Sequence, residues 1–186
     1  VTGKDADFDP SRLVMLYNTE LANELGNLCN RALNMTQRFT AGILHRGGMT
    51  SDDDLALQSS LITSTADYRA AMDEFNVAAA LEAISRHVVH CNGYAERMKP
   101  WELNKDPQKH ERLATVLYHL AESVAHCAVL LGPILPTAIG SLAAQLKLPH
   151  LAQLHLHDLH WGLIADGHEI DKPAPVFPRI IDAEPA

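Results

Sequence analysis

Apolar residues recur at steps of three and four along the first forty positions, the spacing of an α-helix with one buried stripe. The stripe consists of Val14, Tyr17, Leu21, Leu25, Leu28, Ala32, Met35 and Phe39. Asp9 and Pro10 supply an N-cap and a first-turn proline, so the helix is expected to begin there. It should end near Phe39, because the glycines of the following AGILHRGG segment favour irregular backbone.

The second and third predicted helices are marked by a cap and by a proline stop. Ser51 precedes three aspartates at positions 52–54, whose negative charge is favourable at a helix N-terminus. This helix is polar, and no clear signal marks its end. A third apolar stripe consists of Val77, Leu81, Ile84, Val88, Cys91, Ala95 and Met98. It must stop by Lys99, because a residue that precedes proline is pushed out of the helical region. Trp101 is therefore expected at or just past a helix end.

A fourth helix is predicted from Asp106 and Pro107, which repeat the combination of cap and proline. Its stripe consists of Leu113, Leu117, Leu120, Val124, Cys127 and Leu131, broadened by Ala114, Ala121, Ala125 and Ala128. Such a broad apolar surface predicts a central helix. Pro133 and Pro136 then break the chain before a short fifth helix over residues 137–146.

No alternation of apolar and polar residues is long enough to predict a sheet. After Leu148 the helical pattern gives way to HLHDLHWG and to the proline-rich DKPAPVFPRI. The predicted fold is therefore all-α: an antiparallel bundle of about five helices over residues 1–148, followed by an extended C-terminal tail over residues 149–186.

Composition narrows the possible functions. The 186 residues, 47% of them hydrophobic, suffice for one domain with a core. The net charge of −8 disfavours DNA and non-specific nucleic-acid binding, so any RNA contact must be local. No run approaches the roughly eighteen uninterrupted apolar residues of a membrane helix. The three cysteines lack CxxC spacing and lie in apolar helical patterns, which favours buried thiols in a reducing cytoplasm. Because the sequence starts at Val1, both an excised fragment and a processed product remain open.

Three residues carry the most distinctive chemistry. Asn27 and Arg31 lie one turn apart on the rim of the first predicted helix, and Trp101 follows Pro100. Taken singly, the polar pair is an ordinary solvated or interhelical contact, and the tryptophan is a packing plug. Together, an amide, a guanidinium and an indole are the groups that hydrogen-bond and stack an unpaired base, which makes RNA the first hypothesis.

Four segments extend this hypothesis to the whole chain. They are LANELGNLCNRALNM, NGYAERMKPWELNKD, RLATVLYHLAESVAHCAVLLGPILPTAIGSL and GHEIDKPAPVFPRI. In order and spacing they resemble the C-terminal part of bacterial methionyl-tRNA synthetases, from about Asp7 to Ile180. In that family the LGNLxxR segment lies on the first helix of the anticodon-binding bundle, and the PW dipeptide follows a later helix.

The resemblance implies a role for each site residue. Asn27 and Arg31 match the family residues that hydrogen-bond the first base of the CAU anticodon, and Trp101 matches the aromatic residue that stacks on that base. Pro100 would orient the ring, and Glu96 matches a family position near the anticodon. The implied partners are the anticodon loop of tRNA(Met) and a synthetase catalytic domain in cis. The implied function is recognition, so that the full enzyme can attach methionine using ATP.

The chain also departs from the family. Neither the HIGH nor the KMSKS signature of the catalytic domain occurs, so ATP, Mg and all catalytic residues are expected in the parent catalytic domain and not here. The AGILHRGGM loop differs from the more usual glycine-isoleucine-proline ending. The KPAPVFPRI segment resembles the part that folds back toward the catalytic domain.

Two other classes of protein remain open. One is a helical protein-interaction module that has kept the bundle without RNA binding. The other is a His-rich metal-binding bundle, since His87, His90 and Cys91 share a helical face while His119 and His126 lie on the fourth helix. No carboxylate recurs at Glu-x-x-His spacing on paired helices, so no metal site is predicted.

Overall fold

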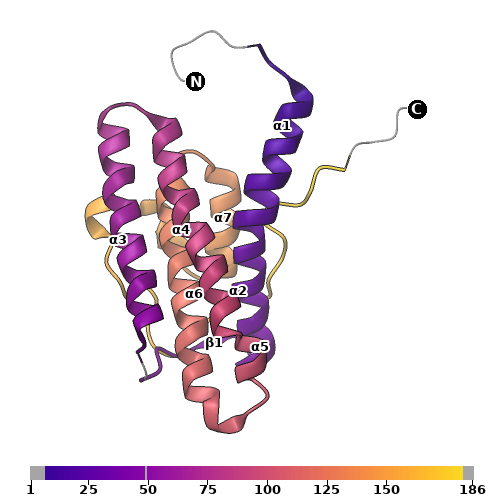
Figure 1. The fold of residues 1–186 in the computed structure, drawn as a ribbon, viewed down its shortest axis with the longest axis vertical. Helices are drawn as coiled ribbons and strands as arrows, with labels where there is room; N and C mark the ends of the chain where they lie inside the picture. Colours follow the sequence, from indigo (N-terminus) through magenta and orange to yellow (C-terminus); the bar gives the residue numbers. More distant parts are fainter. Residues whose placement is uncertain (1–6, 49, 182–186) are drawn as a thin grey trace.

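The computed structural model describes residues 7–48 and 50–181 as a helical bundle (Figure 1). Its α-helices are α1 Pro10–Leu16, α2 Gly26–Phe39, α3 Asp52–Asp73, α4 Val77–Met98, α5 Pro100–Leu103, α6 His110–Leu131 and α7 Pro136–Gln145. A π-helical segment, η1 Tyr17–Leu25, joins α1 to α2, and 3-10 turns span η2 Pro107–Lys109, η3 Pro149–Gln153 and η4 Leu156–Asp158. The predicted all-α class is confirmed.

The first helical run begins and ends where its pattern predicts. The side chain of Asp9 accepts hydrogen bonds from the backbone N–H groups of Ser11 at 2.9 Å and Arg12 at 3.2 Å. The π-helical middle of the run was not predicted. Within it the apolar stripe advances only in steps of four residues, which suits the wider turn of a helix with i to i+5 hydrogen bonds. The run is therefore continuous to Phe39, but it is not one regular α-helix.

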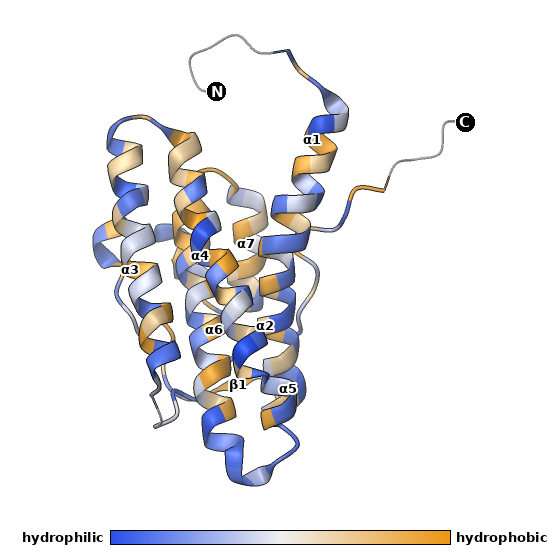
Figure 2. Cartoon of the chain, viewed as in Figure 1, coloured by the Kyte–Doolittle hydropathy of each residue, from blue (hydrophilic) through white to orange (hydrophobic). Residues whose placement is uncertain are grey.

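Helix α6 forms the centre of the bundle, as its broad apolar surface predicts. Every residue from Thr115 to Leu131 is buried, and α2, α3, α4 and α7 all pack against this helix. Figure 2 shows apolar residues along α6 and α7 and polar residues in the turn that precedes α6. Among the described residues, the segment Pro107–Leu131 is long and apolar enough to cross a membrane, but 94% of its apolar window is buried inside the bundle.

Helices α3 and α4 form an antiparallel pair that packs on α6. Ser51 caps α3 as predicted: its hydroxyl accepts from the N–H of Asp54, and its own N–H donates to the Asp54 carboxylate at 2.8 Å. The sequence pattern wrongly places one residue of the α4 stripe in the core. Leu81 is 38% exposed because it lines a surface groove opposite η1 instead of the core.

The C-terminal segment runs back over the bundle. A short antiparallel pairing joins β1 Ile43–Leu44 to β2 His168–Glu169, with Ile43 opposite Glu169 and Leu44 opposite His168. Two residues are too few for a recognisable alternation, which is why this pairing was not predicted. The buried side chains of the segment include Ile164, Ile170 and Phe177.

Two polar anchors fix this segment. The carboxylate of Glu122, fully buried on α6, accepts hydrogen bonds from the N–H groups of Gly162 and Leu163 at 2.6 Å each and of Ile164 at 3.0 Å. The Tyr118 hydroxyl donates to the Ile164 carbonyl at 2.7 Å. A buried carboxylate needs such donors, so the chain around Ile164 is held tightly against α6.

Candidate nucleic-acid interface

The packing of α2 against α4 brings the predicted site residues together. Asn27 and Arg31 lie on α2, Glu96 lies in the last turn of α4, and Pro100 and Trp101 begin α5. Arg31 contacts both Glu96 and Trp101, and Asn27 contacts α4 one turn earlier. Residues from three helices therefore form one polar and aromatic surface.

Arg31 is the centre of this surface. Its Nη2 lies 2.8 Å from Oε1 of Glu96, and its Cζ lies 5.4 Å from the centroid of the Trp101 ring. The arginine side chain is 24% exposed and the glutamate side chain 62% exposed, so the ion pair is open to solvent on one side. A guanidinium at this distance over an indole makes a cation–π contact. The three side chains thus present a flat ring, hydrogen-bond donors and an acceptor next to one another.

The backbone at the end of α4 places Trp101 at the surface. Lys99 adopts the left-handed conformation, with φ of 46°, which ends α4 and turns the chain. Pro100 follows at the first position of α5 and is buried, whereas Trp101 is half-buried. The stop predicted at Lys99 is confirmed. The proline packs inward and leaves the adjacent indole partly open.

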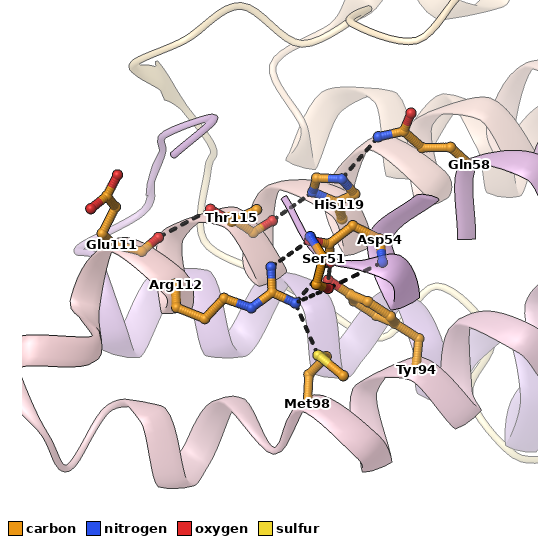
Figure 3. Close-up of polar contacts among 9 residues, drawn as sticks. All are labelled: Ser51, Asp54, Gln58, Tyr94, Met98, Glu111, Arg112, Thr115 and His119. Atoms are coloured by element: carbon orange, nitrogen blue, oxygen red, sulfur yellow. Dashed lines mark hydrogen bonds and ion pairs between the residues drawn. The ribbon is translucent and has the colours of Figure 1, made fainter. Parts of the chain in front are cut away.

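A polar network on the inner side of α4 holds this turn in place (Figure 3). The guanidinium of Arg112 on α6 forms a two-point ion pair with the Asp54 carboxylate at the start of α3. The same group contacts Sδ of Met98 at 3.0 Å, and the Tyr94 hydroxyl donates to Asp54. Because Tyr94 and Met98 lie on the last turns of α4, the network fixes the helix end from which Trp101 projects.

The charge state of Asp54 follows from these contacts. Burial alone would raise the pKa of this carboxyl group. Hydrogen bonds from Arg112, Tyr94 and the Ser51 backbone outweigh burial and lower the pKa to about 2. The carboxylate is therefore ionised near neutral pH and stabilises the junction of α3, α4 and α6.

Two residues of the interface, Asn92 and Glu24, were not predicted as site residues. Nδ2 of Asn92 donates to the Glu24 backbone carbonyl at 3.3 Å and to the Glu24 carboxylate at 3.2 Å. Oδ1 of Asn92 in turn accepts from Nδ2 of Asn27 at 3.5 Å. A signal was present in the sequence, because Asn92 and Glu96 are one turn apart, like Asn27 and Arg31. Matching polar rows on two helices indicate a shared face once the helices are known to be neighbours.

The His/Cys cluster that the sequence offered as an alternative site is held by hydrogen bonds around His87. Nδ1 of His87 lies 3.2 Å from the Ser60 hydroxyl, and its Nε2 lies 3.3 Å from Sγ of Cys91. Burial, with a contribution from nearby histidines, lowers the pKa of His87 to about 3, and burial raises the pKa of the Cys91 thiol. Over residues 7–48 and 50–181, no group of three or more His, Cys, Asp or Glu side chains is arranged to hold a metal ion.

The fold and this surface define a helical-bundle domain with an aromatic and polar face where α2, α4 and α5 meet. Residues 44–186 match the family described as the anticodon binding domain of methionyl tRNA ligase. The chain belongs to this family. The match covers Glu96, Pro100 and Trp101, whereas Asn27 and Arg31 lie before the matched range.

Longer relatives extend the similarity over the first helix. The chain is 30% identical over 180 residues to the methionine–tRNA ligase of Fusobacterium nucleatum, covering 96% of this chain and 28% of the relative. It is 33% identical over 186 residues to the methionine–tRNA ligase of Streptomyces coelicolor, covering 96% of this chain and 35% of the relative. The chain thus spans about a third or less of the length of these curated relatives.

Solved structures show the same similarity. The apo form of Mycobacterium tuberculosis methionyl-tRNA synthetase superposes with a TM-score of 0.88 at 29% identity, covering 97% of this chain and 36% of that chain. The same synthetase bound by methionyl-adenylate gives a TM-score of 0.86 at 30% identity, covering 95% of this chain and 35% of that chain. The similarity therefore includes the helix that carries Asn27 and Arg31.

Proposed function

We propose that this chain recognises the anticodon loop of tRNA(Met) and reads its CAU anticodon for a methionine–tRNA ligase. The observation that carries the proposal is the placement of Arg31 over the half-buried ring of Trp101, with Asn27 one helical turn away. These groups can stack one unpaired base and hydrogen-bond its edge. Family membership supports the assignment of this surface to an anticodon.

The energetics of such a site match a tethered domain. Stacking of a base on an aromatic side chain contributes ~1–3 kcal/mol. After the loss of association entropy, one stacked base and a few hydrogen bonds give affinities of roughly micromolar to millimolar. In the parent protein the tether would raise the local concentration of the anticodon and make this weak contact effective.

Charge supports recognition through a few specific contacts. The net charge of −8 disfavours non-specific binding to the phosphate backbone. Arg31 is itself balanced by Glu96. Specific stacking and hydrogen bonding must therefore supply the selectivity, and binding should depend on salt less steeply than it does for a basic RNA-binding domain.

The proposal includes a catalytic domain in the same polypeptide, in the cytoplasm, where the ATP-dependent joining of methionine to tRNA would occur. The tail over residues 149–186 would face that domain. In support, the described tail ends beside the first helical run: the Asn18 side chain exchanges two hydrogen bonds of 2.9 Å with the backbone of Ile180. Ile181 next to it is 85% exposed, as a side chain at a domain boundary would be in the isolated chain.

The test is a titration of the chain with labelled anticodon stem-loops. A CAU loop should bind more tightly than a loop of the same stem with a mismatched anticodon, and added CAU loop should protect Trp101 from quenchers. Equal affinity for both loops would contradict anticodon reading. A stable protein complex that leaves Trp101 unprotected by RNA would instead favour the protein-interaction module.

A further inference from the structure

Glu24, Asn92 and Asn27 form a chain of hydrogen bonds that leads from η1 through α4 to the proposed base site. Asn92 donates from Nδ2 to both the backbone carbonyl and the carboxylate of Glu24, at 3.3 and 3.2 Å. Asn92 accepts at Oδ1 from Nδ2 of Asn27, at 3.5 Å. All three contacts are partly buried, which reduces competition from bulk water.

The contacts with Glu24 decide which group donates and which accepts in this series of hydrogen bonds. A carboxylate and a backbone carbonyl can only accept hydrogen bonds, so Asn92 must turn its NH₂ group toward Glu24. The carbonyl oxygen of Asn92 then faces Asn27, so Asn27 must donate a hydrogen bond to it from its own NH₂ group. Among the described residues, Oδ1 of Asn27 accepts no hydrogen bond, so this acceptor and the second N–H of the amide remain for a ligand, each at a fixed position.

We propose that Glu24 and Asn92 are positioning residues that fix the amide of Asn27 with its carbonyl oxygen toward a bound base, and that this orientation selects cytosine over uracil. The inference rests on the proposed function and deepens it. It adds two residues that do not touch the RNA, and it assigns to them the discrimination between the two pyrimidines.

The complementarity follows from the edges of the bases. Cytosine presents an amino group next to two acceptors, whereas uracil presents a carbonyl oxygen at the position of that amino group. An acceptor from Asn27 and donors from Arg31 match the cytosine pattern. With uracil, the Asn27 carbonyl would meet another carbonyl, and the amide could place an N–H group at that position only by rotating and breaking its contact with Asn92.

The test compares two stem-loops that differ only in cytosine or uracil at the first anticodon position. The wild type should prefer cytosine by about tenfold or more, the size expected for one hydrogen bond gained or lost. In Asn92→Ala the amide of Asn27 can rotate freely, so the preference should fall to about twofold, chiefly through tighter binding of the uracil loop.

Two further substitutions of Asn92 guard against a merely structural effect of Asn92→Ala. Asn92→Leu has a side chain of similar size without a polar group, so it should lose the preference as Asn92→Ala does, whereas Asn92→Gln keeps an amide that can donate to the Glu24 carbonyl and accept from Asn27. Asn92→Gln should therefore keep most of the cytosine preference, whereas Glu24→Gln, whose amide can donate as well as accept, should lose part of it. Glu74→Gln, an exposed position at the opposite end of α4 from Trp101, is the control for the change in charge.

The outcomes separate the two proposals. If the wild type does not distinguish the CAU loop from a loop with a mismatched anticodon, the proposed function fails. If the wild type prefers cytosine and Asn92→Ala retains that preference in full, anticodon reading stands and the positioning role of Asn92 is overturned. Loss of the preference in both Asn92→Ala and Asn92→Leu, together with its retention in Asn92→Gln, supports the inference.

Discussion

The guanidinium of Arg31 lies over the indole of Trp101, with Cζ 5.4 Å from the ring centroid, and the same group is ion-paired to Glu96 at 2.8 Å. The ring and its cationic partner are therefore already held in position in the unbound chain. A base that stacks on Trp101 must share the ring with Arg31 or displace it. Because the side chains are partly ordered beforehand, binding loses less conformational entropy than it would on a mobile surface.

Trp101→Ala should weaken binding of a CAU stem-loop about tenfold, because a stacked base contributes ~1–3 kcal/mol. The half-buried indole is not a core residue, so the helical circular dichroism spectrum should change little. Fluorescence anisotropy of a labelled stem-loop measures the affinity. Trp101→Phe keeps an aromatic face, so its affinity for the stem-loop should lie between those of the wild type and Trp101→Ala. Unchanged affinity of Trp101→Ala would remove stacking from the mechanism.

Arg31→Lys should weaken the same complex several-fold. Lysine keeps the positive charge, but it lacks the planar fork that donates in two directions and lies flat on an aromatic ring. Calorimetric titration with the CAU loop measures the effect. Arg86→Lys is a matched control, because Arg86, on α4, is also a partly exposed arginine and is ion-paired, at 2.6 Å, to Asp67. Full affinity in Arg31→Lys would show that charge alone is sufficient.

Asp54→Asn should lower the free energy of unfolding by about 3 kcal/mol, because it leaves the Arg112 guanidinium without its buried anionic partner. The Asp54 side chain is fully buried. Urea denaturation followed by circular dichroism measures the change. The same substitution at Asp67, in an exposed ion pair with Arg86, should cost less than about 1 kcal/mol. Similar losses at the two positions would contradict the structural role of the buried network.

Mild acid should destabilise the bundle. Burial lowers the pKa of His87 from 6.5 to about 3, and burial also lowers the pKa values of His119 and His126. Below pH 6.5 the unfolded chain binds protons that the folded chain excludes, so the free energy of unfolding should fall as the pH decreases from 6.5 toward 3. Asp54, with a pKa of about 2, should add a further loss below its unfolded value of 3.8.

Thermal melts at a series of pH values test this prediction. The melting temperature should be nearly constant above about pH 7, where neutral histidine predominates in both states, and should decrease steadily below that pH. His87→Gln should flatten the decrease, because it removes the most strongly shifted of the three buried histidines. A melting temperature that is the same at neutral and mildly acidic pH would contradict the assignment of these histidines as neutral.

The sequence by itself determined the helices. Residue types at the ends, such as Asp9 with Pro10 and Ser51 with its aspartates, define the starts, and Lys99 before Pro100 defines a stop, because capping and proline geometry act locally. Apolar periodicity identified α6 as the central helix, since burial on all sides requires apolar residues on all sides. These features depend on neighbours in the chain, so they can be read from it.

Only the tertiary structure decided which residues meet. The rotation of α2 against α4 sets Arg31 beside Trp101 and joins Asn27 through Asn92 to Glu24, and no local pattern specifies that rotation. The π-helical turns of η1 and the binding of the tail by Glu122 are likewise products of packing between segments distant in sequence. Periodicity identifies the face that a helix buries, but the side chains that line the junction depend on how two such faces interlock.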